Sequence, residues 1–111
     1  MKTLDQFDFH HTLEASRGQV LVVFTAPHCG ACNMLREALV DYQSAHPEVL
    51  IYEVDTQRDP GLGEEFGVFH LPALFLYADG RYHAEIRCEA LPEKIAEALD
   101  QAMDTPPEET P

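Results

Sequence analysis

The chain contains a continuous apolar run, Val20 to Phe24, and the motif Cys29-Gly30-Ala31-Cys32 follows it after a short polar stretch. An uninterrupted run of this kind is typical of a strand that is buried on both faces, and such burial needs helices above and below the sheet. Apolar residues at helical spacing then continue from Met34 to Tyr42. Because strand, loop and helix follow one another directly, the sequence favours an α/β fold.

The first cysteine of the motif is expected at the N-terminus of the helix. Backbone N–H groups there have no helical partner, and the helix dipole adds partial positive charge. This environment stabilises a thiolate, which is the reactive form of cysteine. The spacing places Cys32 one turn further along, within reach of a disulfide with Cys29. The motif therefore indicates a dithiol in which Cys29 attacks a disulfide and Cys32 resolves the mixed disulfide.

The rest of the pattern alternates helices with strands. We expect helices over 8–16, 30–45, 60–66 and from Pro92 onward, and strands over 19–25, 49–54, 74–77 and 82–87. Asp79-Gly80 is a typical hairpin turn between the last two strands. This order predicts a central mixed sheet of four to five strands flanked by about four helices. One domain should span 1–103, and residues 104–111 should form a disordered, acidic, Pro-rich tail.

The amino-acid composition limits the kinds of partner and the compartment that we expect for this protein. A net charge of −13 argues against nucleic acid and against anionic membranes, since both need basic patches. An odd count of three cysteines, two of them in the motif, does not fit a secreted disulfide scaffold. The first residues lack the features of a secretory signal, so we expect a cytoplasmic protein. We also expect a monomer.

Two segments resemble the thioredoxin family. Residues 26–32 (APHCGAC) resemble its active-site loop, A-P-W-C-G-P-C, and Leu71-Pro72-Ala73 resembles its cis-proline segment. The resemblance covers roughly residues 1–103 and implies the thioredoxin fold, with a cis Leu71–Pro72 bond facing the dithiol.

The same resemblance implies a thiol–disulfide oxidoreductase that acts on protein substrates, most often by reduction. It implies that an extended substrate contacts Gly30, Ala31, Leu71, Pro72 and Ala73. It implies no bound cofactor and no metal, because electrons would come from a partner reductase or a small thiol.

Several positions depart from the family pattern. His28 replaces a tryptophan, Ala31 replaces a proline, and Val23 and Ile51 stand where the family has a buried acid and its lysine partner. We therefore expect proton transfer to rely on water or a histidine, and the dithiol to be less strongly reducing than in a standard thioredoxin.

The remaining candidates allow more than one interpretation. His28 and His70 are candidates for proton transfer or for tuning the thiol pKa, or else surface residues. Cys88 is expected to be a small packed hydrophobe, or otherwise a site of glutathione capping or intermolecular linkage. His10, His11, His46 and His83 are interpreted as surface histidines. Phe66, Phe69 and Leu71 are expected to line an apolar rim around the dithiol.

Two other functions stay open at this point. One is a chaperone or assembly module in which the dithiol is secondary. The other is a metal-binding module that uses Cys29, Cys32, His28 and His70, although adjacent His28 and Cys29 cannot easily reach one metal ion.

Overall fold

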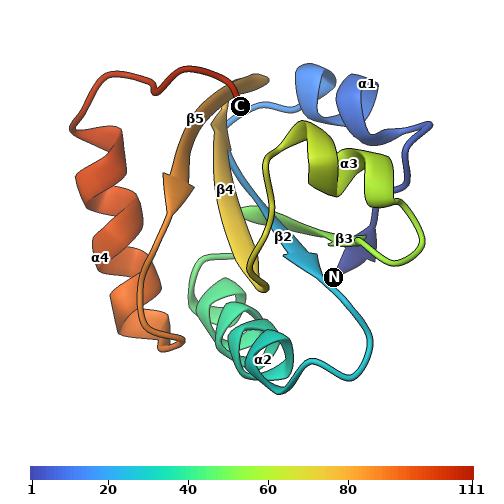
Figure 1. Ribbon diagram of the computed structural model, residues 1–111. Coiled ribbons are helices and arrows are strands. Elements are labelled where there is room, and N and C mark those ends of the chain that lie inside the picture. Colours follow the sequence, from blue (N-terminus) through green and yellow to red (C-terminus); the bar gives the residue numbers. More distant parts are fainter.

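The computed structural model describes all residues from Met1 to Pro111. Five strands and four helices follow one another along the chain (Figure 1). The strands are β1 (Lys2–Thr3), β2 (Gln19–Thr25), β3 (Leu50–Asp55), β4 (Ala73–Ala78) and β5 (Arg81–Ile86). The helices are α1 (Phe9–Ala15), α2 (Gly30–Ala45), α3 (Pro60–Glu65) and α4 (Pro92–Met103).

All strands belong to one mixed sheet with the order β1-β3-β2-β4-β5. The strands β1, β3 and β2 run parallel, whereas β4 is antiparallel to β2 and β5 is antiparallel to β4. The apolar strand β2 lies in the centre, where it is paired on both edges and covered on both faces. Because the motif helix α2 begins where β2 ends, Cys29 and Cys32 lie at the edge formed by the carboxyl end of the central strand.

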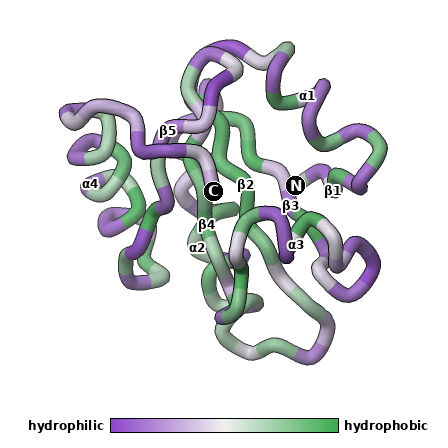
Figure 2. The backbone as a smooth tube through the Cα atoms, turned by 45° about the horizontal axis from the view of Figure 1, so that its top comes forward, coloured by the Kyte–Doolittle hydropathy of each residue, from purple (hydrophilic) through white to green (hydrophobic).

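Helices cover the two faces of the sheet in pairs. One buried cluster joins alternate residues of the central strands, including Val23 and Ile51, to α2 and α4. A second cluster on the opposite face joins Phe24 and Phe75 to α1 and to Phe66 after α3. Hydrophobic residues are concentrated in the central strands, whereas the helices also carry many hydrophilic residues (Figure 2). The fold class expected from the sequence is confirmed.

The structure adds one strand that the sequence pattern does not predict. β1 contains only Lys2 and Thr3, and these residues pair with Tyr52 and Glu53 at the edge of β3. Both β1 residues are exposed, so neither apolar alternation nor length marks them as a strand.

Residues 104–111 form no helix or strand and are exposed, and the prediction that they are disordered stays a prediction. Two hydrogen bonds nevertheless connect the tail to β5, between Glu108 N and His83 O (2.7 Å) and between Glu85 N and Glu108 Oε1 (3.0 Å).

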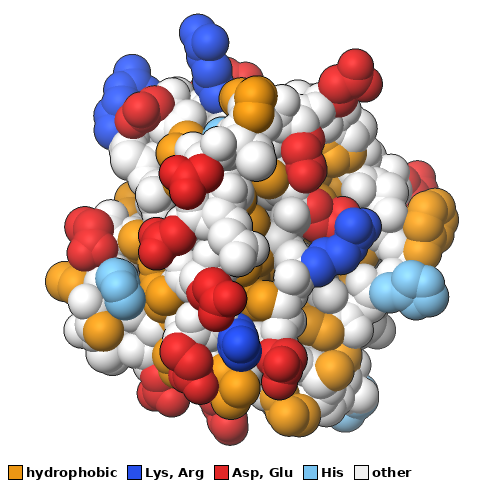
Figure 3. Space-filling model, turned by 90° about the vertical axis from the view of Figure 1, so that its left-hand side faces the viewer, with side chains coloured by type: hydrophobic (Ala, Val, Ile, Leu, Met, Phe, Trp, Pro, Cys, Tyr) orange, Lys and Arg blue, Asp and Glu red, His pale blue; other side chains and the backbone are white.

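Acidic residues are spread over the surface. On the face that α4 covers, Asp and Glu side chains are scattered among fewer basic ones (Figure 3). None of the helices combines the length and the apolar character that a membrane crossing requires.

Candidate active site

The two motif cysteines form a disulfide at the start of α2, with their Cα atoms 5.2 Å apart. Cys29 is the N-cap of α2 in an extended conformation, and its Sγ accepts a hydrogen bond from the Cys32 amide at 3.2 Å. Cys32 is fully buried, whereas Cys29 is half-buried. Only the Cys29 sulfur is therefore open to a large partner, and it lies where the helix N-terminus favours negative charge.

The loop between β2 and α2 turns sharply at His28. This residue has a φ of 61°, in the left-handed region that side chains other than glycine rarely adopt. His28 is exposed and lines a polar pocket together with Thr25, Asn33, Arg36 and Glu53. The backbone turn lets Cys29 enter α2 as its cap. The structure thus places the His28 side chain on the polar side of the dithiol loop.

The Leu71–Pro72 peptide bond is cis, the isomer that the resemblance implies. Pro72, Ala73 and Ala31 line a groove of about 610 Å³ that also includes Met34 and His70. Most residues around the groove are hydrophobic, and Phe69 at its rim is 90% exposed. An apolar groove therefore runs directly beside the dithiol.

The residues predicted to contact a substrate divide between this groove and its surroundings. Ala31, Pro72 and Ala73 line it, whereas Gly30 and Leu71 do not. Leu71 is partly buried and packs against the cluster on the α1 and α3 face, and its expected place on the apolar rim stays a prediction. The groove does include Phe66 and Phe69. His70 lines the groove and His28 the polar pocket, so the two histidines lie in different cavities.

The two positions at which the family has a buried acid and its lysine partner lie in an apolar environment in this structure. Val23 is fully buried and Ile51 is 4% exposed, and both belong to the cluster beneath α2. In the sheet, however, Val23 is the register partner of Glu53 on β3. An acid thus lies beside the expected position, on the neighbouring strand.

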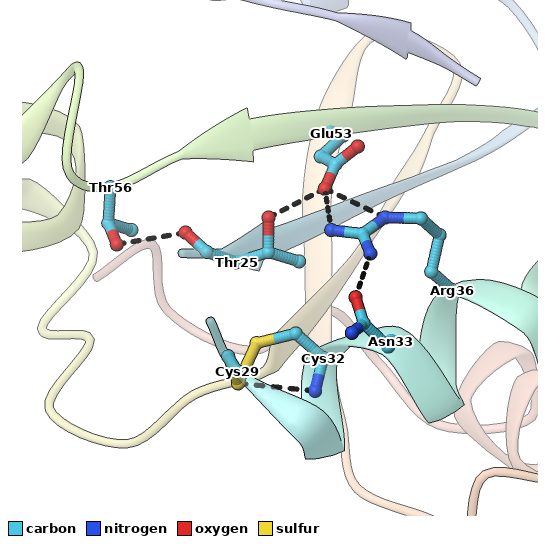
Figure 4. Close-up of a disulfide and its surroundings, with 7 residues drawn as sticks. All are labelled: Thr25, Cys29, Cys32, Asn33, Arg36, Glu53 and Thr56. Carbon is cyan, nitrogen blue, oxygen red and sulfur yellow. Dashed lines mark hydrogen bonds and ion pairs between the residues drawn. A yellow bond between two sulfur atoms is a disulfide. The ribbon is translucent and has the colours of Figure 1, made fainter. Parts of the chain in front are cut away.

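Glu53 on β3 is held by partners from two other elements, β2 and α2 (Figure 4). Its Oε2 accepts hydrogen bonds from the Thr25 hydroxyl at 2.6 Å and from Arg36 through Nε (3.1 Å) and Nη2 (2.5 Å). Burial alone raises the pKa of Glu53, but the hydrogen bonds from Arg36 and Thr25, with the charge of Arg36, outweigh it and lower the pKa. Glu53 is therefore ionised at neutral pH and is a poor proton acceptor.

Sequence reasoning missed this network. A threonine at the end of an apolar strand and a glutamate within another are the signals for it, since polar residues in buried strands need partners. Their partners cannot be assigned without the β2–β3 register.

Two other predictions are wrong. His83 is not on the surface: it is 6% exposed, and its Nε2 lies 2.6 Å from the carbonyl oxygen of Ala102 because α4 packs against β5. Cys88 is not packed but exposed, because it follows the end of β5 in a loop at the edge of the apolar groove. Its location at that groove leaves the alternative of glutathione capping or intermolecular linkage as a prediction.

The structure brings no three His, Cys, Asp or Glu side chains together in an arrangement that would hold a metal ion. The sulfurs of Cys29 and Cys32 are bonded to each other, and His28 and His70 lie in different cavities.

The five-stranded sheet and the accessible disulfide at the start of α2 define a protein of the thioredoxin fold with a two-cysteine site. The sequence model of the family "Thioredoxin" matches residues 1–101. The chain belongs to the thioredoxin family.

Two relatives and one solved structure illustrate the similarity. A thioredoxin of Chlamydia muridarum is 41% identical over 64 residues, which are 58% of this chain and 63% of that protein. A thioredoxin of Griffithsia pacifica is 30% identical over 74 residues, which are 66% of this chain and 68% of that protein. The crystal structure of oxidised mitochondrial thioredoxin 3 from Saccharomyces cerevisiae matches with a TM-score of 0.78 at 22% identity, covering 91% of this chain and 94% of the other.

Proposed function

We propose that this protein reduces disulfides in protein substrates through Cys29 and Cys32. The observation that carries this proposal is the disulfide at the N-terminus of α2, with a half-buried Cys29 and a fully buried Cys32. The Cys29 thiolate attacks a substrate disulfide, forms a mixed disulfide and releases one substrate thiolate. Cys32 then attacks Cys29, which releases the second substrate thiol and leaves the Cys29–Cys32 disulfide.

A substrate in an extended conformation would lie along the cis Leu71–Pro72 segment. Ala31, Pro72 and Ala73 line the adjoining apolar groove, which suits apolar side chains next to the substrate cysteine. The oxidised protein would return to the dithiol form by exchange with a partner reductase or a small thiol. No bound cofactor takes part in these steps.

The reducing direction requires a compartment that keeps thiols reduced, and we place the protein in the cytoplasm. The exposed free thiol of Cys88 supports this, because oxidising compartments disfavour unpaired surface cysteines. We further propose that it acts as a monomer, which size-exclusion chromatography with light scattering checks.

Reduction of insulin by dithiothreitol, followed by turbidity, tests the proposal. The wild-type protein should accelerate precipitation of the insulin B chain, and Cys29→Ser should return the rate to that of dithiothreitol alone. Cys32→Ser should accumulate a mixed disulfide with the substrate, because the resolving thiol is gone. If wild type and Cys29→Ser are equally inactive, the proposal that this protein reduces disulfides is wrong.

A further inference from the structure

The hydrogen-bond network around Glu53 connects both ends of the dithiol loop. Thr25 is the last residue of β2, where the loop begins, and Arg36 lies on α2, which the loop enters. Arg36 also donates from Nη1 to the Asn33 side chain at 2.6 Å, one residue after Cys32. Thr25 is fixed in turn by Thr56, whose amide and hydroxyl both donate to the Thr25 carbonyl at 2.9 Å. The network therefore holds strand end and helix start in one arrangement.

The charges of this network lie over the turn of α2 that carries the disulfide. Arg36 follows Cys32 by one helical turn, so the two side chains share a face of α2. Figure 4 shows the guanidinium of Arg36 and the carboxylate of Glu53 above the first turn of α2, on the side of the disulfide that faces the sheet. Side-chain exposure is 34% for Arg36 and 17% for Glu53, so water screens their fields less than at an open surface.

The two charges oppose each other at the dithiol. Reduction turns a neutral disulfide into a pair that carries negative charge on the thiolate. A nearby cation stabilises that state, and a nearby anion destabilises it. With Arg36 and Glu53 in direct contact, the two effects largely cancel. Asp55, Arg58 and His28 line the same polar pocket, and Arg58 forms an ion pair with Asp59.

We propose that Glu53 and Arg36 are a positioning pair that sets the reduction potential of the Cys29–Cys32 couple by balancing one negative and one positive charge beside it. This inference rests on the redox role proposed above and deepens it. Glu53 stands beside Val23, so the acid in this part of the sheet contributes a balanced charge and is no proton acceptor.

Opposite single changes should shift the potential in opposite directions. Glu53→Gln leaves Arg36 uncompensated, which stabilises the thiolate, raises the potential and lowers the pKa of Cys29. Arg36→Met leaves Glu53 uncompensated, which destabilises the thiolate and lowers the potential. The double variant Arg36→Met/Glu53→Gln should lie near the wild type.

Equilibration of each variant with dithiothreitol redox buffers at pH 7 measures the effect. We expect a threefold to tenfold change in the equilibrium constant for each single variant, where tenfold corresponds to about 30 mV. Lys94→Met and Glu97→Gln make the same changes in net charge on the exposed face of α4, and they should not move the potential. Alkylation of the reduced proteins by iodoacetamide across pH gives the Cys29 pKa independently.

A merely structural role would lower the stability of both variants to urea without opposite shifts in potential. Shifts of the same sign, no shift, or equal shifts in the α4 controls would overturn the proposal. The wild type separates this failure from failure of the proposed function: if it neither cycles in the redox buffers nor reduces insulin, the redox role itself is wrong. If it does both and the variants show no opposite shifts, only the charge-balance proposal is wrong.

Discussion

At the scale of single residues, the thiols of Cys88 and Cys29 occupy opposite electrostatic environments. Cys29 caps α2 and accepts a hydrogen bond from the Cys32 amide. Cys88 lies in the loop after β5, where partial burial of its thiol, together with the charge of Glu89, raises its pKa. The helix N-terminus thus favours the thiolate form of Cys29, whereas partial burial and Glu89 disfavour the thiolate form of Cys88. Cys88 nevertheless lines the apolar groove that runs beside Cys29.

This difference predicts slow chemistry at Cys88. Because its pKa is raised, less thiolate exists at neutral pH, and alkylation should be slower than for free cysteine. In the oxidised protein Cys88 is the one free thiol, so the rate of iodoacetamide labelling against pH reports its pKa alone. We expect a midpoint above the value of about 8.5 for free cysteine.

The control for this experiment is Cys88→Ser, which should show no labelling in the oxidised state and unchanged insulin reduction. A labelling midpoint at or below that of free cysteine would contradict the prediction and would point to an activated third thiol at the groove.

The sequence predicted the positions of residues whose place depends on their neighbours in the chain. It did not predict contacts that depend on how the strands pair. Cys29 and Cys32 stand next to an apolar strand in sequence, so their place at a helix start follows from neighbours alone. Glu53 and Arg36 meet only because β3 lies beside β2 and α2 packs above both. No spacing in the chain encodes that contact, which explains why the charge pair of the site was missed.

At the scale of elements, the β4–β5 hairpin shows how turn chemistry fixes an arrangement. Asp79 and Gly80 have φ values of 51° and 83°, the combination that a two-residue type I′ turn requires. The turn is tied to the loop before β2, since Asp79 N donates to Gly18 O at 3.0 Å and Gly18 N donates to Asp79 Oδ1 at 2.8 Å. The hairpin therefore orients β5, and with it the edge of the groove.

Gly80→Ala should destabilise the protein. A Cβ at this position would collide with the backbone carbonyl oxygen of Glu14, and the positive φ disfavours any side chain. We expect a loss of about 1–3 kcal/mol in the free energy of unfolding, measured by urea denaturation.

The matched control is Gly61→Ala in α3, where nothing lies within 4 Å of the new Cβ apart from the adjoining residues and the backbone of the helix itself. This variant should be neutral or more stable by up to about 1 kcal/mol, because alanine favours the helix. Equal stability of the Gly80 variant and the wild type would contradict the assigned turn.

The bounds of long helices and strands were predictable, because each contains apolar residues at a regular spacing and residues that mark its end. The bounds of β2 and α2 agree with the expected 19–25 and 30–45. β1 was not predictable, since two exposed residues become a strand only through the neighbouring edge of β3.

At the scale of the whole molecule, the two edge strands of the sheet differ in length. β1 ends one edge with two residues, whereas β5 at the other edge is six residues long. An uncovered edge of that length invites pairing with other chains. After α4 the tail returns to β5, across the molecule from α2 (Figure 1). There Glu108 bonds to the outward-facing backbone of His83 and Glu85.

The contact predicts that the tail protects the β5 edge from exchange with solvent. Removing residues 106–111 takes away the acceptor of the Glu85 amide, a bond worth about 0.5–1.5 kcal/mol. Hydrogen exchange at Glu85, followed by NMR, should therefore become about threefold to tenfold faster. The Ala84 amide, which faces β4 by strand alternation, should keep its rate and serves as the internal control. Insulin reduction should persist, because residues 106–111 include neither the dithiol nor any residue that lines the groove beside it. Equal exchange at Glu85 in both chains would show that the tail leaves β5 open and is disordered along its whole length, as its composition predicts.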